Sequence, residues 1–282
     1  MGFFQNLKNR RREKDAKNHK IPRRVYLLEK NTPFDITEAF RNLKASLSVS
    51  IPEKQGGSII TFTSSYPEDG KTMVTVNLAL MFAMSDAKVV LIDADIRKGR
   101  VAKYFQCKSS PGLSDYLSGL VSFEEILHHS PVNENLYFIP CGTHSPKPYE
   151  LLESEKMATF LEELRQKFDY TVIDTPPVLM VSDALAIAPK TDGAVLICRH
   201  NVSFISDVQR SLATLQFAKA EVLGVVVNDY HAAQGKIYSN YRGYYNYSKY
   251  SYNYGYTCDE NDLDEDEKAN QAEQTKDTTA KN

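Results

Sequence analysis

The alternation of apolar, β-rich runs with helical segments through the middle of the chain constrains its fold more than any other feature. The β-rich runs lie at 58–65, 88–93, 170–174, 193–198 and 221–228. The helical segments lie at 71–84, 154–168 and near 203–217. Such alternation predicts an α/β fold with a mostly parallel sheet, helices on both faces and right-handed crossovers. In that architecture ligands bind at the carboxyl ends of the strands.

The segment 154–168 illustrates how one of these helices would pack. Its apolar residues recur at helical spacing and are Met157, Phe160, Leu161, Leu164 and Phe168. Residues spaced by three and four lie on the same side of a helix, so this pattern predicts one buried face.

The two ends of the chain are polar and differ in charge. Residues 1–24 carry nine Lys/Arg and two acids, whereas 257–282 carry nine acids and three lysines. We expect 1–34 to be a basic arm, which either stays solvated or contacts an anionic membrane surface or an acidic partner. The acidic segment 257–282 has too few apolar residues to offset its ordering entropy, so we expect it to be disordered. The folded domain would then span 35–230.

The sequence carries no signal for secretion or for crossing a membrane. No apolar run reaches the roughly 20 residues of a membrane span, and no secretory signal is recognisable. The four cysteines are widely spaced, which indicates neither a disulfide framework nor a zinc site. The adjacent His128 and His129 are expected in a helix or loop and do not indicate a metal site. These features predict a soluble, cytoplasmic protein.

The first β-rich run leads into "SSYPEDGKTMV", where Gly70, Lys71 and Thr72 open a helix. The backbone N–H groups and the positive dipole end of a helix N-terminus favour phosphate. The lysine would reach the outer phosphates and the threonine hydroxyl would bind Mg²⁺. The usual pattern has glycine in place of Ser65, so this segment alone also fits an ordinary helix start.

Carboxylates follow two of the other β-rich runs. In "VVLIDAD", Asp93 and Asp95 are two residues apart at the end of a strand, so both would project on the same face. One could hold Mg²⁺ through water while the other accepts a proton. In "YTVIDTPP", Asp174 occupies the usual place of the outer ligand of a nucleotide's Mg²⁺. Taken singly, these aspartates could cap loops. Together with the phosphate loop they predict one nucleotide site.

These three segments, in this order and followed by a tyrosine-rich stretch, resemble the bacterial tyrosine kinases of capsule and exopolysaccharide synthesis. The resemblance covers roughly residues 35–256. It implies a P-loop NTPase-like fold that is unrelated to eukaryotic kinases. Within the loop, Glu68 departs from the family pattern, in which glycine is more usual. Glu68 and Asp69 would have to point into water, away from the phosphates.

The resemblance implies ATP and Mg²⁺ as cofactors and gives roles to individual residues. The catalytic residues it implies are Lys71, Asp93 and Asp95. The nucleotide-binding residues are Ser65, Asp69, Gly70, Lys71, Thr72, Met73 and Asn228, the last by similarity to the adenine-contacting asparagine of positioning ATPases. The metal ligands are Thr72, Asp95 and Asp174.

A further family feature is an oligomerisation motif of Glu, Arg and Arg at three-residue steps. The segment "TEAFRNLKAS" supplies Glu38, Arg41 and Lys44 on one helical face. Lysine lacks the bidentate fork of arginine, so contacts in a ring of subunits would be weaker or differ in geometry. Without the resemblance, the same residues equally fit a solvated charged face.

The segment 231–256 is rich in tyrosine, and the resemblance makes its tyrosines substrates. Nine of them lie between 238 and 256: Tyr238, Tyr241, Tyr244, Tyr245, Tyr247, Tyr250, Tyr252, Tyr254 and Tyr256. A pKa of about 10 keeps a free tyrosine hydroxyl protonated, so a nearby base is needed, and Asp93 is the candidate.

The sequence therefore predicts an ATP-dependent protein tyrosine kinase that autophosphorylates this segment in trans and regulates the synthesis and export of capsular or extracellular polysaccharide. The resemblance implies a homo-oligomeric ring and a cognate tyrosine phosphatase, without nucleic acid. It also implies a membrane adaptor, whose cytosolic end recruits the chain to the inner face of the membrane. Two alternatives stay open: a positioning or partitioning ATPase, and a tyrosine-rich interaction element without enzymology.

Overall fold

The computed structural model describes residues 27–29, 31–52 and 54–230. The sequence predictions for residues 1–24, for the tyrosine-rich segment 231–256 and for the acidic segment 257–282 lie outside the described residues. This includes all nine tyrosines predicted as substrates.

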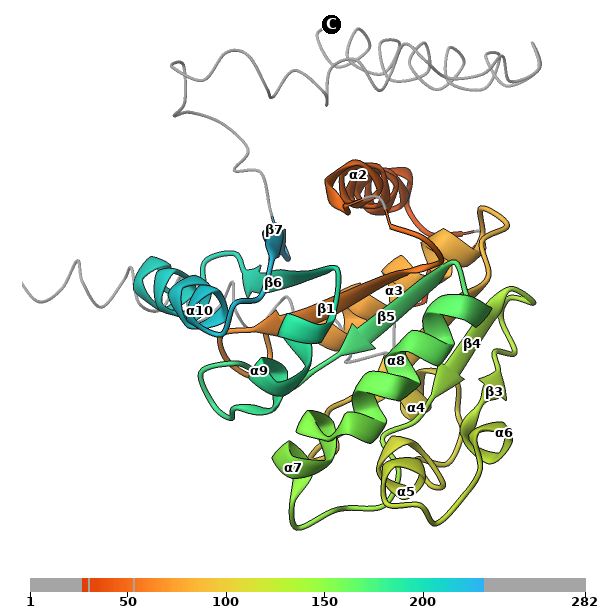
Figure 1. Cartoon of the computed structure of the whole chain (residues 1–282). Helices are drawn as coiled ribbons and strands as arrows, with labels where there is room; N and C mark the ends of the chain where they lie inside the picture. Colours follow the sequence, from red (N-terminus) through yellow and green to blue (C-terminus); the bar gives the residue numbers. More distant parts are fainter. Residues whose placement is uncertain (1–26, 30, 53, 231–282) are drawn as a thin grey trace, which may run out of the picture. The chain divides into compact units, whose positions relative to one another are not determined.

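Seven strands form a single sheet in the order β3-β4-β2-β5-β1-β6-β7 (Figure 1). Their bounds are β1 (Ser58–Ser64), β2 (Val89–Asp93), β3 (His128–His129), β4 (Leu136–Ile139), β5 (Tyr170–Asp174), β6 (Gly193–Arg199) and β7 (Val222–Asn228). Neighbouring strands are parallel throughout, except that β3 is antiparallel to β4. The predicted mostly parallel α/β sheet is confirmed.

Helices cover the sheet and connect its strands. They are α2 (Phe34–Ser50), α3 (Lys71–Ala83), α4 (Val101–Tyr104), α5 (Leu113–Leu117), α6 (Phe123–Ile126), α7 (Pro148–Glu153), α8 (Glu155–Lys167), α9 (Asp183–Ile187), the 3₁₀ turn η1 (Ala188–Lys190) and α10 (Ile205–Phe217). Among the described residues, no helix combines the length and the apolar character needed to cross a bilayer.

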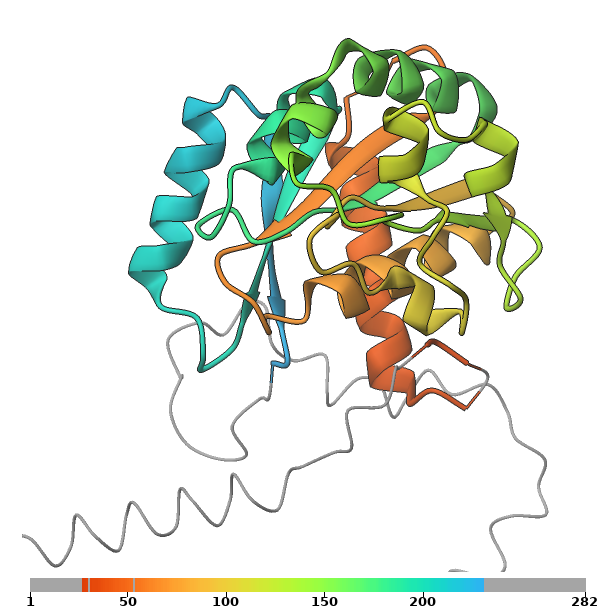
Figure 2. The same ribbon diagram turned by 90° about the horizontal axis from the view of Figure 1, so that it is seen from below.

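The strand residues divide between two cores by simple alternation. In β2, Val89 and Leu91 pack in the core beneath α2 and α3, whereas Val90 and Ile92 pack in the core beneath α8. Successive side chains of a strand point to opposite faces, so a continuously apolar strand is buried on both sides. Figures 1 and 2 show α3 on one side of the sheet and α8 on the other.

Helix α8 follows its sequence prediction closely. The hydroxyl of Ser154 accepts a hydrogen bond from the backbone N–H of Met157 at 3.2 Å and so caps the helix start. All five residues of the predicted apolar face are buried. The helix therefore supplies one wall of the core, as its spacing indicated.

The sequence prediction for His128 and His129 is wrong. These residues form the edge strand β3, which pairs with Tyr137 and Phe138 of β4. The ring of His128 stacks on Phe138 at 5.3 Å between centroids, and the ring of His129 meets the edge of Tyr137 at 5.1 Å. Two residues are too few to show a strand period, and cross-strand ring contacts favour the pairing.

Candidate active site

The carboxyl ends of three adjacent strands, β2, β5 and β1, meet at one edge of the sheet. Asp93 is the last residue of β2 and Asp174 is the last residue of β5, and the two lie opposite each other in the strand register. The loop that follows β1 ends at Lys71, the first residue of α3. The structure therefore brings together the three segments that the sequence singled out.

Lys71, Thr72 and Asp174 form a hydrogen-bonded group at the start of α3. The Lys71 Nζ donates to Asp174 Oδ1 at 2.5 Å, and the Thr72 hydroxyl donates to Asp174 Oδ2 at 2.7 Å. The side chains of Lys71 and Asp174 are only 8% and 1% exposed. This carboxylate thus occupies the space next to the two side chains predicted to hold phosphate and metal.

Asp93 is fully buried, and within the part of the chain that the structure describes its hydrogen-bond donors are backbone N–H groups. Its Oδ2 accepts from Val101 at 2.9 Å, and its Oδ1 accepts from Asp95 at 3.3 Å. Burial and the nearby Asp174 carboxylate raise the pKa of Asp93 to about 8, although the Val101 hydrogen bond and Lys71 act in the opposite direction. A carboxyl with so high a pKa is a stronger base than an ordinary aspartate, as proton abstraction requires.

Asp95 lies just beyond the strand, in the turn that follows it. Its Oδ1 accepts the backbone N–H of Lys98 at 2.9 Å, so it does cap a turn. Burial raises the pKa of Asp95, whereas the Lys71 ammonium lowers it, so Asp95 is close enough to Lys71 to interact with its charge. The capping role of Asp95 is therefore observed, and its metal or catalytic role stays a prediction.

The phosphate loop closes on Asn228, the last residue of β7. Gly70 adopts the left-handed region with φ +85°, and a Cβ built there would lie 2.0 Å from Asn228 Nδ2. The same amide donates to the backbone oxygen of Asp69 at 2.9 Å. Only glycine fits so close an approach. Asn228 thus supports the loop backbone here, and its predicted nucleotide contact stays a prediction.

The prediction that Asp69 points into water is wrong. Asp69 is 3% exposed, and its Oδ1 accepts from the Ser203 hydroxyl at 2.8 Å, while its Oδ2 accepts from the Tyr66 N–H at 3.3 Å. These bonds satisfy the buried carboxylate and brace the loop from inside. Glu68 is exposed, as predicted. The Ser65 hydroxyl faces α10, where it lies 2.8 Å from the hydroxyl of Ser211.

The donor chemistry at the strand ends fits Mg²⁺. This ion prefers oxygen ligands and keeps several waters, so one or two protein oxygens plus phosphates commonly hold it. Thr72 and Asp174 present such oxygens side by side, and Asp95 is close enough to interact with the charges of Lys71 and Asp174. Across the described residues, no cluster of three or more His, Cys, Asp or Glu side chains is arranged as a complete metal cage. Met73 follows Thr72 in α3 and is half-buried.

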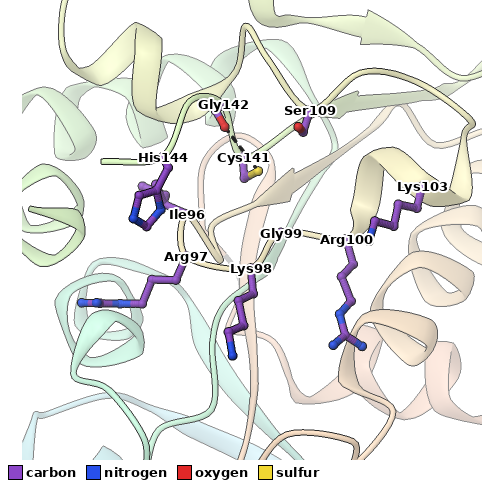
Figure 3. Close-up of a pocket in the computed structure, with 10 residues that line it drawn as sticks. All are labelled: Ile96, Arg97, Lys98, Gly99, Arg100, Lys103, Ser109, Cys141, Gly142 and His144. Atoms are coloured by element: carbon purple, nitrogen blue, oxygen red, sulfur yellow. Dashed lines mark hydrogen bonds between the residues drawn. The ribbon is translucent and has the colours of Figure 1, made fainter. Parts of the chain in front are cut away.

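Sequence reasoning missed a cationic loop beside these carboxylates. Arg97 forms a bidentate pair with buried Asp183, with Nε–Oδ2 at 2.8 Å and Nη2–Oδ1 at 3.0 Å. Lys98, Arg100 and Lys103 follow it and line a cavity (Figure 3). The run of cations in "DIRKGR" was the available signal, since it directly follows the predicted aspartates.

The three residues of the predicted oligomerisation motif lie on α2. Arg41 donates from Nη1 to Glu38 Oε1, and Lys44 Nζ donates to the Ser85 hydroxyl at 2.5 Å. Arg41 thus forms an intrahelical ion pair, whereas Lys44 is directed to the segment after α3. The ring of subunits stays a prediction.

Comparisons with known proteins agree with this geometry. The AAA domain family matches residues 57–216. Among curated proteins, "Putative tyrosine-protein kinase EpsB" of Ralstonia solanacearum is 34% identical over 233 residues, covering 80% of this chain and 30% of the relative. The chain therefore spans less than a third of that protein's length.

Solved structures show the same likeness. The kinase domain of Escherichia coli tyrosine kinase ETK matches with a TM-score of 0.65 and 31% identity, covering 78% of this chain and 90% of that domain. The cell division ATPase MinD of Pyrococcus furiosus matches less well, with a TM-score of 0.54 and 25% identity over 65% of this chain and 76% of that one.

Proposed function

Since the chain belongs to the AAA domain family and is homologous to the bacterial tyrosine kinases, we propose that it is an ATP-dependent protein tyrosine kinase. The observation that carries this proposal is the meeting of Lys71, Thr72, Asp93 and Asp174 at one edge of the sheet. A phosphate-binding helix start, an oxygen pair for Mg²⁺ and a base of raised pKa are the parts that phosphoryl transfer to a hydroxyl needs.

Lys71 and the loop N–H groups bind the phosphates of ATP in this proposal. The Lys71 ammonium pairs with Asp174 in the structure, so it exchanges this partner for the outer phosphates when the nucleotide enters. Thr72, Asp174 and Asp95 would hold Mg²⁺, which would supply positive charge to offset that of the phosphates. Little covalent chemistry is required of the protein, because alignment and charge stabilisation dominate phosphoryl transfer.

Asp93 accepts the proton of the attacking tyrosine hydroxyl. Its burial and its neighbour Asp174 make it a stronger base, and its two backbone hydrogen bonds fix its position. Tyr104 lies nearby in α4, and burial and Asp174 raise its pKa to about 12, which makes its own hydroxyl a poor nucleophile. The acceptors we propose are the tyrosines between 238 and 256, supplied in trans by another copy.

The biological setting we propose follows the relatives. The chain would regulate synthesis and export of capsular or extracellular polysaccharide, and a cognate phosphatase would reset it. A membrane adaptor would recruit it to the inner membrane face and stimulate its activity. Copies would form a ring through Glu38, Arg41 and Lys44. The bond of Lys44 to Ser85 supports a weaker ring contact, since this ammonium already has a partner in its own chain.

A second candidate function is a positioning-type ATPase, favoured by the likeness to MinD. Such an enzyme would use the same loop and carboxylates but transfer the phosphoryl group to water. The two functions differ in the acceptor alone, so the product decides between them.

The test is incubation of the purified full chain with labelled ATP and Mg²⁺, followed by phosphate mapping with mass spectrometry. Phosphotyrosine between 238 and 256 supports the kinase, whereas free phosphate alone supports the ATPase. Lys71→Met should abolish either product, while Lys167→Met, at an exposed lysine in the last turn of α8, should leave it unchanged. If neither product forms in the wild-type chain, the proposed function fails.

A further inference from the structure

A cationic cavity of about 460 Å³ lies beside the strand-end carboxylates (Figure 3). Its walls come from the loop between β2 and α4, from Lys103 of α4, and from Cys141, Gly142 and His144 after β4. Figure 3 shows Lys98 and Arg100 extending on the same side of the loop. None of the roles proposed above uses this cavity.

The cations of this cavity differ in how far their charge is offset. Arg97 is paired with Asp183, which neutralises it. Lys98, Arg100 and Lys103 are exposed, and none of them forms an ion pair with any described residue. We call these three residues the basic triplet. Lysine and arginine placed together bind phosphate well, arginine through its bidentate fork.

The cavity shares a wall with the proposed base. A Cβ on Gly99 would lie 2.5 Å from Cys141 Sγ and 2.7 Å from Asp93 Oδ2, so the loop backbone is packed directly against this carboxylate. The Val101 N–H, at the start of α4, donates to the same oxygen. A ligand held by the basic triplet therefore lies next to Asp93, separated from it only by this loop.

This arrangement distinguishes a tyrosine from its phosphorylated form. A tyrosine side chain is neutral and can approach Asp93, whereas a phosphotyrosine carries about −1.5 to −2 charges and is repelled by the neighbouring Asp174 carboxylate. The adjoining basic triplet attracts the same group. We propose that this cavity binds a phosphotyrosine of another copy's tyrosine-rich segment and retains that segment for further rounds of transfer. The proposal rests on the kinase function proposed above.

The spacing of the tyrosines suits such retention. Tyr250, Tyr252, Tyr254 and Tyr256 follow one another at two-residue steps. Two residues of extended chain span at most about 7 Å, so a neighbouring tyrosine stays close to a phosphotyrosine bound in the cavity. A retained segment could thus present its next hydroxyl to Asp93 without first dissociating.

Binding to the dephosphorylated full chain tests the proposal. The probe is a fluorescent peptide of residues 247–256 phosphorylated at Tyr254, compared with the same peptide unmodified and with an acidic peptide of residues 257–268. Replacing Lys98→Ala and Lys103→Ala together should weaken phosphopeptide binding about tenfold or more, since each removes a charge-assisted contact. The matched control, Lys88→Ala with Lys167→Ala, removes two exposed lysines at the other end of the sheet and should have no effect.

Several results would overturn the proposal. They are equal affinity for the phosphorylated and unmodified peptides, equal loss in both double variants, and tighter binding of the acidic peptide, which would assign the cavity to carboxylates. Displacement of the phosphopeptide by equimolar inorganic phosphate would also count against it, because the phosphate alone would then account for binding. A circular dichroism spectrum should show that both variants are folded.

A time course of autophosphorylation gives a second readout. The wild-type chain should pass quickly from singly to multiply phosphorylated tails, whereas the Lys98→Ala/Lys103→Ala variant should accumulate singly phosphorylated ones at an unchanged rate of first transfer. Identical distributions would contradict retention. If no phosphotyrosine forms in any variant, the kinase function fails, while the synthetic phosphopeptide still decides whether the cavity binds its ligand.

Discussion

The two ends of the same sheet hold buried aspartates whose pKa values are shifted in opposite directions. At the amino ends of the strands, hydrogen bonds from Arg165, Lys54 and the Ile59 N–H outweigh burial and lower the pKa of Asp192. At the carboxyl ends, burial and a second carboxylate raise the pKa of Asp93. Nearby donors and cations thus stabilise the charged form of Asp192, whereas the surroundings of Asp93 favour its neutral form.

The surroundings of Asp192 explain its state. It accepts Arg165 Nη1 at 2.7 Å and Nη2 at 3.0 Å, Lys54 Nζ at 2.6 Å and the Ile59 N–H at 2.7 Å. These bonds tie α8 and the start of β1 to the residue preceding β6. A buried carboxylate with this many donors stabilises the fold, because the hydrogen bonds and ion pairs offset the cost of removing it from water.

The surroundings of Asp93 differ in kind. It accepts two backbone N–H hydrogen bonds and lies near Asp174, and no described cation forms an ion pair with it, since Lys71 pairs with Asp174. This arrangement costs stability, and such costs are typical of catalytic sites. Substitution of Asp93 should therefore lower activity without lowering stability, whereas substitution of Asp192 should lower stability without lowering activity.

The largest expected effect is on catalysis at the carboxyl end. Asp93→Asn keeps the shape and an oxygen for the Val101 N–H but removes the base, so tyrosine phosphorylation should fall about 10²- to 10⁴-fold. The unfolding temperature should stay the same or rise, because a poorly compensated carboxyl is removed. Phosphotransfer assays and thermal unfolding of the same preparation measure both. A lower unfolding temperature, or activity within a few-fold of wild type, would contradict the claim that Asp93 serves catalysis rather than stability.

The reverse separation is expected at the amino end. Asp192→Asn removes the buried counter-charge of the largely buried Arg165 and leaves it the exposed Glu162, so the free energy of unfolding should fall by about 3 kcal/mol. Phosphotransfer per folded molecule should be unchanged, because Asp192 lies at the opposite ends of the strands. Urea unfolding and an assay well below the melting temperature test this. Loss of activity in the folded variant would show that the two ends are coupled.

Acid should remove part of that same stabilisation. The folded-state pKa of Asp192 lies below its unfolded value, so its contribution is present above the unfolded pKa and is lost as the pH falls through the folded pKa. The wild-type chain should therefore lose more unfolding free energy between about pH 5 and pH 2 than Asp192→Asn does. Parallel slopes for the two proteins in urea unfolding at stepped pH would contradict this assignment.

The smallest effect is expected at the rim of the same network. Lys54 is 52% exposed, so its ion pair with Asp192 is screened by solvent. Lys54→Ala should lower the free energy of unfolding by about 0.5 kcal/mol, much less than Asp192→Asn. A loss as large as that of Asp192→Asn would mean that Lys54, rather than Arg165, is the main partner.

The sequence predicted the strands and the carboxylates at their ends because both rest on local patterns. Continuous apolar runs mark strands buried on two faces, and the residues at their ends then share one edge of the sheet. Short elements escaped prediction, since β3 and the one-turn helices carry too few residues to show a period.

Contacts between distant segments also escaped prediction. Asp69 was expected to face water because its charge should avoid the phosphates, and Ser203, which donates to its buried Oδ1, lies 134 residues away. Asn228 was matched to a nucleotide role, and its contact with the phosphate loop emerged only from the folded chain. The Arg97–Asp183 pair likewise joins segments 86 residues apart, so "DIRKGR" alone could not show which of its cations stays uncompensated.

Mixing two full-length variants, each inactive alone, tests most directly whether the strand-end site acts on the tyrosines of another copy. One chain carries Lys71→Met with all nine tyrosines, and the other keeps Lys71 but has phenylalanine at each tyrosine between 238 and 256. Each chain alone should give no tail phosphotyrosine with ATP and Mg²⁺. After mixing, mass spectrometry should find it on the Lys71→Met chain. Its absence there, under conditions in which the wild-type chain modifies itself, would contradict this account.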